Sequence, residues 1–364
     1  MSSPDEAPLE QRIATFIQLN YALEPEVVTR ANALLNEARA LGQPALVGQM
    51  LLERASAMFE NGSRQQALES AREAQRYIAA NHLDTLRAQA QDRLAMYCYD
   101  MAEYLRALDA WLKCLEYASE QNDTYWCARA YIGVGKVYDA LNDYSTARYF
   151  HGVALQLAEK QGNRRQVCQI QINLASVAYK LHDYDRALEA LNSASECMEQ
   201  LDMETDIWQA EVVSYYGLVY FERGEYQQAE HYLNQAHQIY RSHGNRWGET
   251  QVLLNLGRTY RKLGRTEEAL EYLLNADRLA QLANLSPLML QTEELLSQTY
   301  LETGRYREAL IHHKRLHEVL ARLNRSQGSP VRLSKTTANR LKELEHQLDL
   351  ERIRIRCGIG IARA

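Results

Sequence analysis

The stretch LGRTYRKLGRTEEALEYL, residues 256–273, decides the fold of this chain because similar stretches recur along it. Two further copies are YGLVYFERGEYQQAEHYL, from Tyr216, and VGKVYDALNDYSTARYF, from Val134. Aligning the copies on one shared alanine finds seven of them, spaced by 40, 40, 40, 42, 40 and 40 residues. These alanines are Ala67, Ala107, Ala147, Ala187, Ala229, Ala269 and Ala309. The period predicts an array of similar units, each packed on its neighbours.

Three further features recur at fixed distances before each alanine. A small residue twelve positions before it allows two helices to approach closely, and a large residue usually follows three positions later to fill the space between them. Five positions before the alanine stands a turn residue suited to the left-handed conformation that ends a helix. The small residues are Ala55, Ala95, Gly135, Ala175, Gly217, Gly257 and Ser297, and the turn residues are Gly62, Asn142, Gly224, Gly264 and Gly304. The pattern predicts a helical hairpin repeated seven times.

Composition agrees with a helical array. Of the 364 residues 46% are apolar and 24% charged, with a formal net charge of −6, which excludes a collagen-like, disordered or disulfide-scaffold chain. Only 6 prolines and 17 glycines are present, as expected for long helices and short connections. The charge is uneven, because residues 331–364 carry eight basic and four acidic side chains and so leave a net charge of −10 for the remainder.

Motifs for catalysis, metal binding or membrane insertion are absent from the sequence. It contains no phosphate-binding loop, no G-x-S-x-G, no H-E-x-x-H and no G-x-G-x-x-G, so we expect no enzymatic activity and no cofactor. The six cysteines form no C-x-x-C pair and no cluster with histidine at metal-ligand spacing. No apolar run reaches the roughly 18 residues that span a bilayer, and the N-terminus, MSSPDEAPLEQR, does not resemble a signal peptide. We therefore expect a cytoplasmic protein with no membrane partner.

The recurring small, aromatic, glycine and alanine positions resemble the tetratricopeptide repeat (TPR) in a 40-residue form. The resemblance covers Leu46–Asn324 and departs from the pattern at Met58, Cys98, Ala178 and Leu316. It implies an all-α fold, a right-handed superhelical solenoid of seven helical hairpins over residues 46–325. Capping helices are expected in residues 1–45, a linker at 326–330 and a further C-terminal helix in 331–364.

The TPR resemblance also implies a concave groove, lined by the first helices of the units, that binds a protein or peptide segment. Asn173 and Asn255 match a TPR position that often holds the backbone of a ligand peptide, and Leu218 and Phe221 indicate a partly apolar ligand. The full set of predicted groove residues is Arg129, Lys136, Asn173, Tyr179, Lys180, Leu218, Phe221, Asn255, Arg258, Arg261 and Lys262.

Two interpretations of the basic groove residues remain open. They receive an acidic or C-terminal segment, or they form a solvated face paired with neighbouring glutamates. Nucleic acid is not expected as a partner, because the net charge is negative and no basic stripe with interleaved aromatic residues is present.

The C-terminal segment differs from the repeats. Leu341, Leu344, Leu348 and Ile355 have the spacing of a short coiled-coil seam, which would form a homodimer. The alternative is a capping helix on the seventh unit. The run ANRLKELEHQLDLERIR resembles the helix that joins TPR sensory halves of bacterial diguanylate cyclases to their GGDEF domain, but the chain ends at CGIGIARA without that domain.

The sequence thus predicts a non-catalytic interaction module in bacterial signalling, or alternatively the input region of a diguanylate cyclase that lacks its output domain. A third class, similar to TPR-containing peptide-pheromone regulators, lacks support because those carry a distinct N-terminal helical bundle. Only about 45 residues precede the first unit here.

Overall fold

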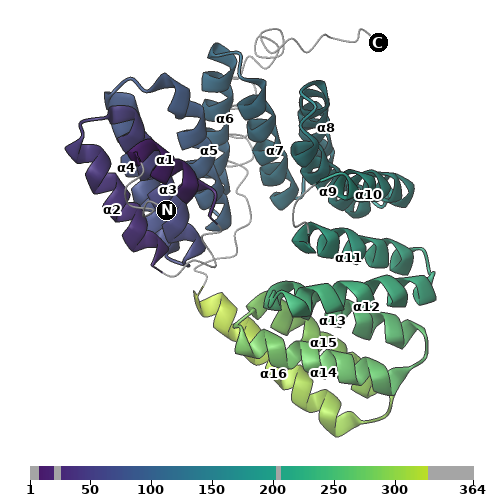
Figure 1. The fold of residues 1–364 in the computed structure, drawn as a ribbon. Helices are drawn as coiled ribbons and strands as arrows, with labels where there is room; N and C mark the ends of the chain where they lie inside the picture. Colours follow the sequence, from purple (N-terminus) through teal and green to yellow (C-terminus); the bar gives the residue numbers. More distant parts are fainter. Residues whose placement is uncertain (1–7, 20–25, 202–205, 327–364) are drawn as a thin grey trace, which may run out of the picture. The chain divides into compact units, whose positions relative to one another are not determined.

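The computed structural model describes residues 8–19, 26–201 and 206–326, and within these ranges every regular element is an α-helix (Figure 1). In chain order the helices are α1 (Leu9–Ile17), α2 (Val27–Ala40), α3 (Pro44–Glu60), α4 (Arg64–Ala80), α5 (Asp84–Asp100), α6 (Tyr104–Glu120), α7 (Thr124–Ala140), α8 (Tyr144–Lys160), α9 (Arg164–Lys180), α10 (Tyr184–Glu199), α11 (Asp206–Glu222), α12 (Tyr226–Ser242), α13 (Arg246–Lys262), α14 (Thr266–Leu282), α15 (Ser286–Glu302) and α16 (Tyr306–Ser326). This confirms the predicted all-α helical repeat.

Helices α3 to α16 pair into hairpins in which consecutive helices lie side by side, as Figure 1 shows for α13 and α14. In each hairpin we call the odd-numbered helix the first helix and the even-numbered one the second helix. The seven alanines that define the period lie on the second helices and are buried; six of them have no exposed surface. The repeat therefore arises because the same buried position is filled by the same small side chain in every hairpin.

The predicted turn residues end the first helices in the left-handed conformation. Backbone φ is +78° at Gly62, +63° at Asn142 and +79° at Gly224, and the same sign occurs at Gly264 and Gly304. In the two hairpins without glycine or asparagine there, the chain still takes this conformation, with φ of +58° at Ala102 and +59° at His182. The geometry of the repeat thus imposes the turn even on residues that do not favour it.

The small residues of the first helices mark close contacts between helices. A Cβ added to Gly217 would lie 2.6 Å from Cγ of Leu233, and one added to Gly257 would lie 2.6 Å from Leu273. Both leucines belong to the second helix of the same hairpin and are fully buried. The glycines are therefore required because a larger residue would overlap the neighbouring helix.

The N-terminal helices α1 and α2 precede the first hairpin and share a hydrophobic core with it. Phe16 of α1 and Leu35 of α2 are each 1% exposed and belong to one cluster with Met50 and Leu51 of α3. The aromatic and aliphatic side chains of α1 and α2 thus cover the apolar face of α3.

The described residues divide into two compact units, the first ending at Gln166 and the second beginning at Val167. The first unit contains α1 to α8, and the second contains nearly all of α9 together with α10 to α16. The two units are described separately below. The predicted seam of Leu341, Leu344, Leu348 and Ile355 lies outside the described residues, so it stays a prediction.

Candidate partner-binding face

Most of the predicted groove residues lie on three first helices of the second unit. They are Asn173, Tyr179 and Lys180 on α9, Leu218 and Phe221 on α11, and Asn255, Arg258, Arg261 and Lys262 on α13. Side-chain contacts described below join α9 to α11, α11 to α13 and α13 to α15, so these helices form one continuous layer. We call the surface formed by these nine residues the first-helix face.

Three polar atoms of the first-helix face are buried hydrogen-bond donors without a partner among the described residues. They are Nδ2 of Asn173, Nδ2 of Asn255 and Nε of Arg261. Asn255 as a whole is only 3% exposed. Leaving such a donor unpaired costs about 1–3 kcal/mol, so an acceptor from water or from a bound molecule would stabilise each of them.

Helix α11 differs from α9 and α13 at the position of these asparagines. Two residues before its small residue, Gly217, it carries Tyr215, and the hydroxyl of Tyr215 lies 2.6 Å from Oγ of Ser176 on α9. This hydrogen bond joins α9 to α11. At this repeat position α11 therefore carries a tyrosine and no side-chain amide. Tyr215 is not among the predicted groove residues, although its place in the repeat, two residues before Gly217, identifies it as equivalent to the two asparagines.

Glu222 at the end of α11 connects the helices on either side. Its Oε1 atom lies 3.7 Å from Nη2 of Arg258 and accepts a 3.5 Å contact from the hydroxyl of Tyr179. The guanidinium of Arg258 also stands over the ring of Phe221, 4.8 Å from its centroid. Burial, followed by the charge of Glu222, raises the pKa of Tyr179 to about 12, so this hydroxyl remains a donor at neutral pH.

The second basic residue of α13 is also paired within the protein. Nη2 of Arg261 donates to Oε1 of Glu302 on α15 at 2.7 Å. The neighbouring Lys262 is exposed and forms no salt bridge with any described residue. The glutamates therefore already neutralise Arg258 and Arg261, and an acidic ligand would have to displace them.

The two remaining predicted residues lie on α7 in the first unit. Nη2 of Arg129 donates at 2.8 Å to Oδ2 of Asp92, whose other oxygen accepts a 3.0 Å hydrogen bond from Nε1 of Trp111. Asp92 is 2% exposed, and its charge raises the pKa of Arg129. Arg129 therefore balances a buried carboxylate. Lys136 is partly exposed on the same helix.

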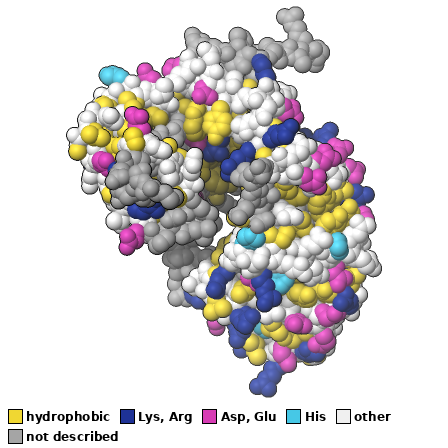
Figure 2. Space-filling model, viewed as in Figure 1, with side chains coloured by type: hydrophobic (Ala, Val, Ile, Leu, Met, Phe, Trp, Pro, Cys, Tyr) yellow, Lys and Arg dark blue, Asp and Glu magenta, His cyan; other side chains and the backbone are white. Residues whose placement is uncertain are grey.

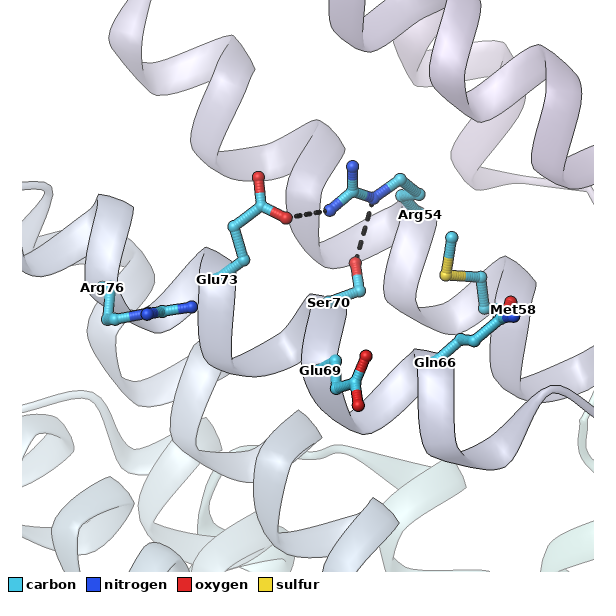
Figure 3. A pocket seen from close by; sticks show the side chains of 7 residues that line it. All are labelled: Arg54, Met58, Gln66, Glu69, Ser70, Glu73 and Arg76. Atoms are coloured by element: carbon cyan, nitrogen blue, oxygen red, sulfur yellow. Dashed lines mark hydrogen bonds and ion pairs between the residues drawn. The ribbon is translucent and has the colours of Figure 1, made fainter.

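An open hollow of about 370 Å³ lies between α3 and α4 of the first unit (Figure 3). Arg54 of α3 extends across it and donates from Nε to Oγ of Ser70 at 3.0 Å, while its Nη2 atom pairs with Glu73 at 2.5 Å. Met58 and Gln66 line its other side. The guanidinium is thus already paired with residues of α4, and no buried, unpartnered side-chain atom lies among the described residues that line this hollow.

Charged side chains of both signs cover the second unit. Figure 2 shows Lys and Arg interspersed with Asp and Glu on the side of it that is in view. Such a mixed surface gives no strong field of one sign.

The cysteines of the described ranges are buried or half-buried. Burial raises the pKa of Cys98 to about 11 and that of Cys168 to about 12, so neither thiol is ionised at neutral pH. No group of three or more His, Cys, Asp or Glu side chains is arranged to hold a metal ion there. Nor does any described helix combine the length and apolar character needed to cross a membrane.

Comparison with known proteins finds a sequence match to a repeat family over part of the chain. A tetratricopeptide-repeat family model matches two segments, residues 166–242 and 249–322. Among proteins of curated function, none matches the sequence. Residues 166–242 and 249–322 thus match tetratricopeptide repeats, and these segments contain the first-helix face.

Solved structures of the same fold cover most of the chain. A Rap protein complexed with competence and sporulation factor shares 18% identity, covers 89% of this chain and 100% of its own, and has a TM-score of 0.55. The apo quorum sensor NprR from B. thuringiensis shares 15% identity over 86% of this chain and 97% of its own, with a TM-score of 0.57. A signal transduction ATPase with a tetratricopeptide repeat sensor, from Pyrococcus horikoshii, shares 15% identity and has a TM-score of 0.65. The likeness covers 90% of this chain and 49% of the ATPase chain. At these identities the likeness establishes the fold.

Proposed function

We propose that this protein binds an extended peptide segment of a partner on the first-helix face of its second unit, as a non-catalytic module in signalling. The observation that carries the proposal is the unpartnered amide nitrogen of Asn255, almost fully buried, with that of Asn173 at the same repeat position of α9. An extended peptide offers carbonyl oxygens at regular intervals along its backbone, which is the acceptor that these donors lack.

The chemistry of the face favours recognition of a peptide backbone over recognition of acidic side chains. Its three unpartnered atoms are all donors, whereas its guanidinium groups, Arg258 and Arg261, already have glutamate partners. Lys262 remains available for one acidic group. We therefore propose a ligand held chiefly by its main chain, with Leu218 and Phe221 in contact with an apolar side chain.

Solved proteins with this fold support a role in signalling. They include a Rap protein complexed with competence and sporulation factor, a quorum sensor and a signal transduction ATPase. The alternative, an input region of a diguanylate cyclase, depends on residues 331–356, which lie outside the described ranges, and it stays a prediction.

A peptide-display library panned against the full chain tests the proposal. The best peptide is synthesised and its affinity measured by isothermal titration calorimetry for the wild type and for Asn173→Ala and Asn255→Ala. Losing one buried hydrogen bond should weaken binding roughly tenfold in each variant.

The matched control is Asn81→Ala, because the amide of Asn81 is exposed and donates to the carbonyl of Tyr77 in its own helix at 2.9 Å. This control should bind like the wild type. The proposal fails if no peptide is enriched, or if the enriched peptide binds both asparagine variants as tightly as the wild type.

A further inference from the structure

Two histidines on the last described helix are held in contact on its exposed side. His313 and His317 stand one turn apart on α16, and both are exposed. Their Nε2 atoms lie 3.2 Å apart, and the rings are nearly perpendicular, with centroids 4.7 Å apart. Residues four apart on a helix are neighbours, so the backbone of α16 maintains this arrangement without help from another element.

The separation of the two nitrogens matches that of two ligands on one metal ion. Zinc takes imidazole nitrogens at about 2.0–2.1 Å in tetrahedral geometry, which places two such nitrogens about 3.3–3.4 Å from each other. The separation already fits, and the ion would take the place of the proton shared between the two nitrogens once the rings turn their lone pairs towards it. A pair already positioned in this way loses less side-chain freedom on binding than two independent histidines would.

The repeat position that His313 occupies is buried in other second helices. His313 occupies the repeat position of Leu233 in α12 and Leu273 in α14, and both leucines are fully buried. On α16 the position is exposed, with Leu310 and Leu320 nearby on the same helix, 53% and 37% exposed. The imidazole pair is therefore open to an ion from solvent.

We propose that His313 and His317 bind one divalent transition-metal ion through their Nε2 atoms, with water completing its coordination. No third His, Cys, Asp or Glu joins them among the described residues, so the protein supplies two ligands to the ion. Neutral imidazole favours borderline ions, so Cu²⁺, Ni²⁺ and Zn²⁺ should bind, and Mg²⁺ and Ca²⁺ should not. This site is independent of the first-helix face and of the function proposed for it.

Calorimetric titration of the full chain with NiCl₂, in a buffer that does not bind metals, tests the site. His313→Ala and His317→Ala should each weaken Ni²⁺ binding roughly tenfold or more, since each removes half of the protein ligands. The double variant should show little additional loss, because the two rings act as one chelating unit. Both residues are exposed, and circular dichroism should show unchanged helix content in every variant.

The chain supplies two controls of matched geometry. His231 and Gln235 of α12 are also four residues apart, with Nε2 atoms 3.0 Å apart, so His317→Gln should keep a side-chain contact with His313 while removing a metal ligand. His231→Ala removes an exposed histidine from another second helix and should leave Ni²⁺ binding unchanged. The proposal is overturned if His317→Gln and His313→Ala bind Ni²⁺ like the wild type. It is also overturned if His231→Ala causes the same loss as they do.

Discussion

Asn173 and Asn255 occupy the same repeat position in α9 and α13, and the amide nitrogen of each is buried without a hydrogen-bond partner in the described structure. Between them, on α11, the equivalent position is held by Tyr215, whose hydroxyl is bonded to Ser176. A stable fold seldom retains one unpaired buried donor, and here the same one occurs twice at equivalent places. This recurrence at equivalent repeat positions is the basis of the proposed peptide-binding role.

Replacing Asn255 by leucine should have opposite effects on stability and on peptide binding. Leucine has a similar volume and no donor, so Asn255→Leu should raise the free energy of unfolding by about 1–3 kcal/mol, because it removes an unsatisfied buried group. The same change should weaken binding of the selected peptide roughly tenfold or more, because the hydrogen bond from Asn255 is lost. Urea denaturation measures the first effect and calorimetry the second. A variant less stable than the wild type would show that the amide has a structural role in the free protein.

Removing Arg129 should destabilise the first unit strongly. Arg129→Met leaves the carboxylate of Asp92 buried with only the indole of Trp111 as a partner, which should cost about 3–5 kcal/mol. As a control, Arg106→Met breaks the exposed 3.0 Å pair with Glu103 and should leave the free energy of unfolding nearly unchanged. Thermal or urea unfolding compares the two. Similar small losses in both variants would contradict the structural role assigned to Arg129.

Much of the fold could be predicted from the sequence because the same physical constraint acts at every repeat. Gly257 and Gly224 illustrate this. A Cβ at Gly257 would overlap Leu273, and the backbone at Gly224 takes φ of +79°, so the residue type records the geometry directly. Seven repetitions make such constraints visible in a single sequence.

The side-chain pairs of the candidate site could not be predicted in the same way. Glu302 is 41 residues from its partner Arg261, and Asp92 is 37 from Arg129. An exposed ion pair such as Arg261–Glu302 contributes little free energy, so the pattern of residues does not determine which acid that arginine will choose. The division between Gln166 and Val167 also lacks a sequence signal, because it falls inside a regular helix, α9.

Substituting glycine for Ala102 should stabilise the chain. Ala102 has φ of +58°, a left-handed conformation that costs an alanine about 1 kcal/mol and glycine very little. Its equivalents Gly62 and Gly224 show that glycine fits this turn. Ala102→Gly should therefore raise the free energy of unfolding by up to about 1 kcal/mol in urea denaturation. A loss of stability would mean that the entropy of glycine in the unfolded chain outweighs the relief of strain.

Replacing two helical glycines by alanine should change the stability of the protein in opposite directions. In Gly217→Ala the new Cβ would lie 2.6 Å from Leu233, so the variant should lose about 1–3 kcal/mol of stability. Gly152 of α8 has no other atom within 4 Å of such a Cβ, so Gly152→Ala should gain up to about 1 kcal/mol from helix propensity. Urea denaturation of both variants checks the signs, and equal effects would contradict the close contact of α11 with α12.

The buried carboxylate of Asp277 should make stability depend on pH. Burial, followed by the charge of Glu293, raises the pKa of Asp277 above its ordinary value of 3.8, although Gln281 donates to it at 2.7 Å and His312 acts in the opposite direction. Because the pKa is higher in the folded chain, ionising Asp277 costs stability. The cost is absent below the unfolded pKa and becomes complete as the pH rises above the folded one.

Asp277→Asn removes that ionisation and keeps a polar side chain for Gln281. The variant should be more stable than the wild type at pH 7, and the difference should shrink towards zero as the pH falls to about 3, below both pKa values. Urea denaturation at several pH values measures the difference. Asp109→Asn, which changes an exposed carboxylate paired with Lys113 at 2.8 Å, provides the control and should show no such gain at pH 7. A variant that loses stability at neutral pH would show that the charge of Asp277 is favourable next to His312.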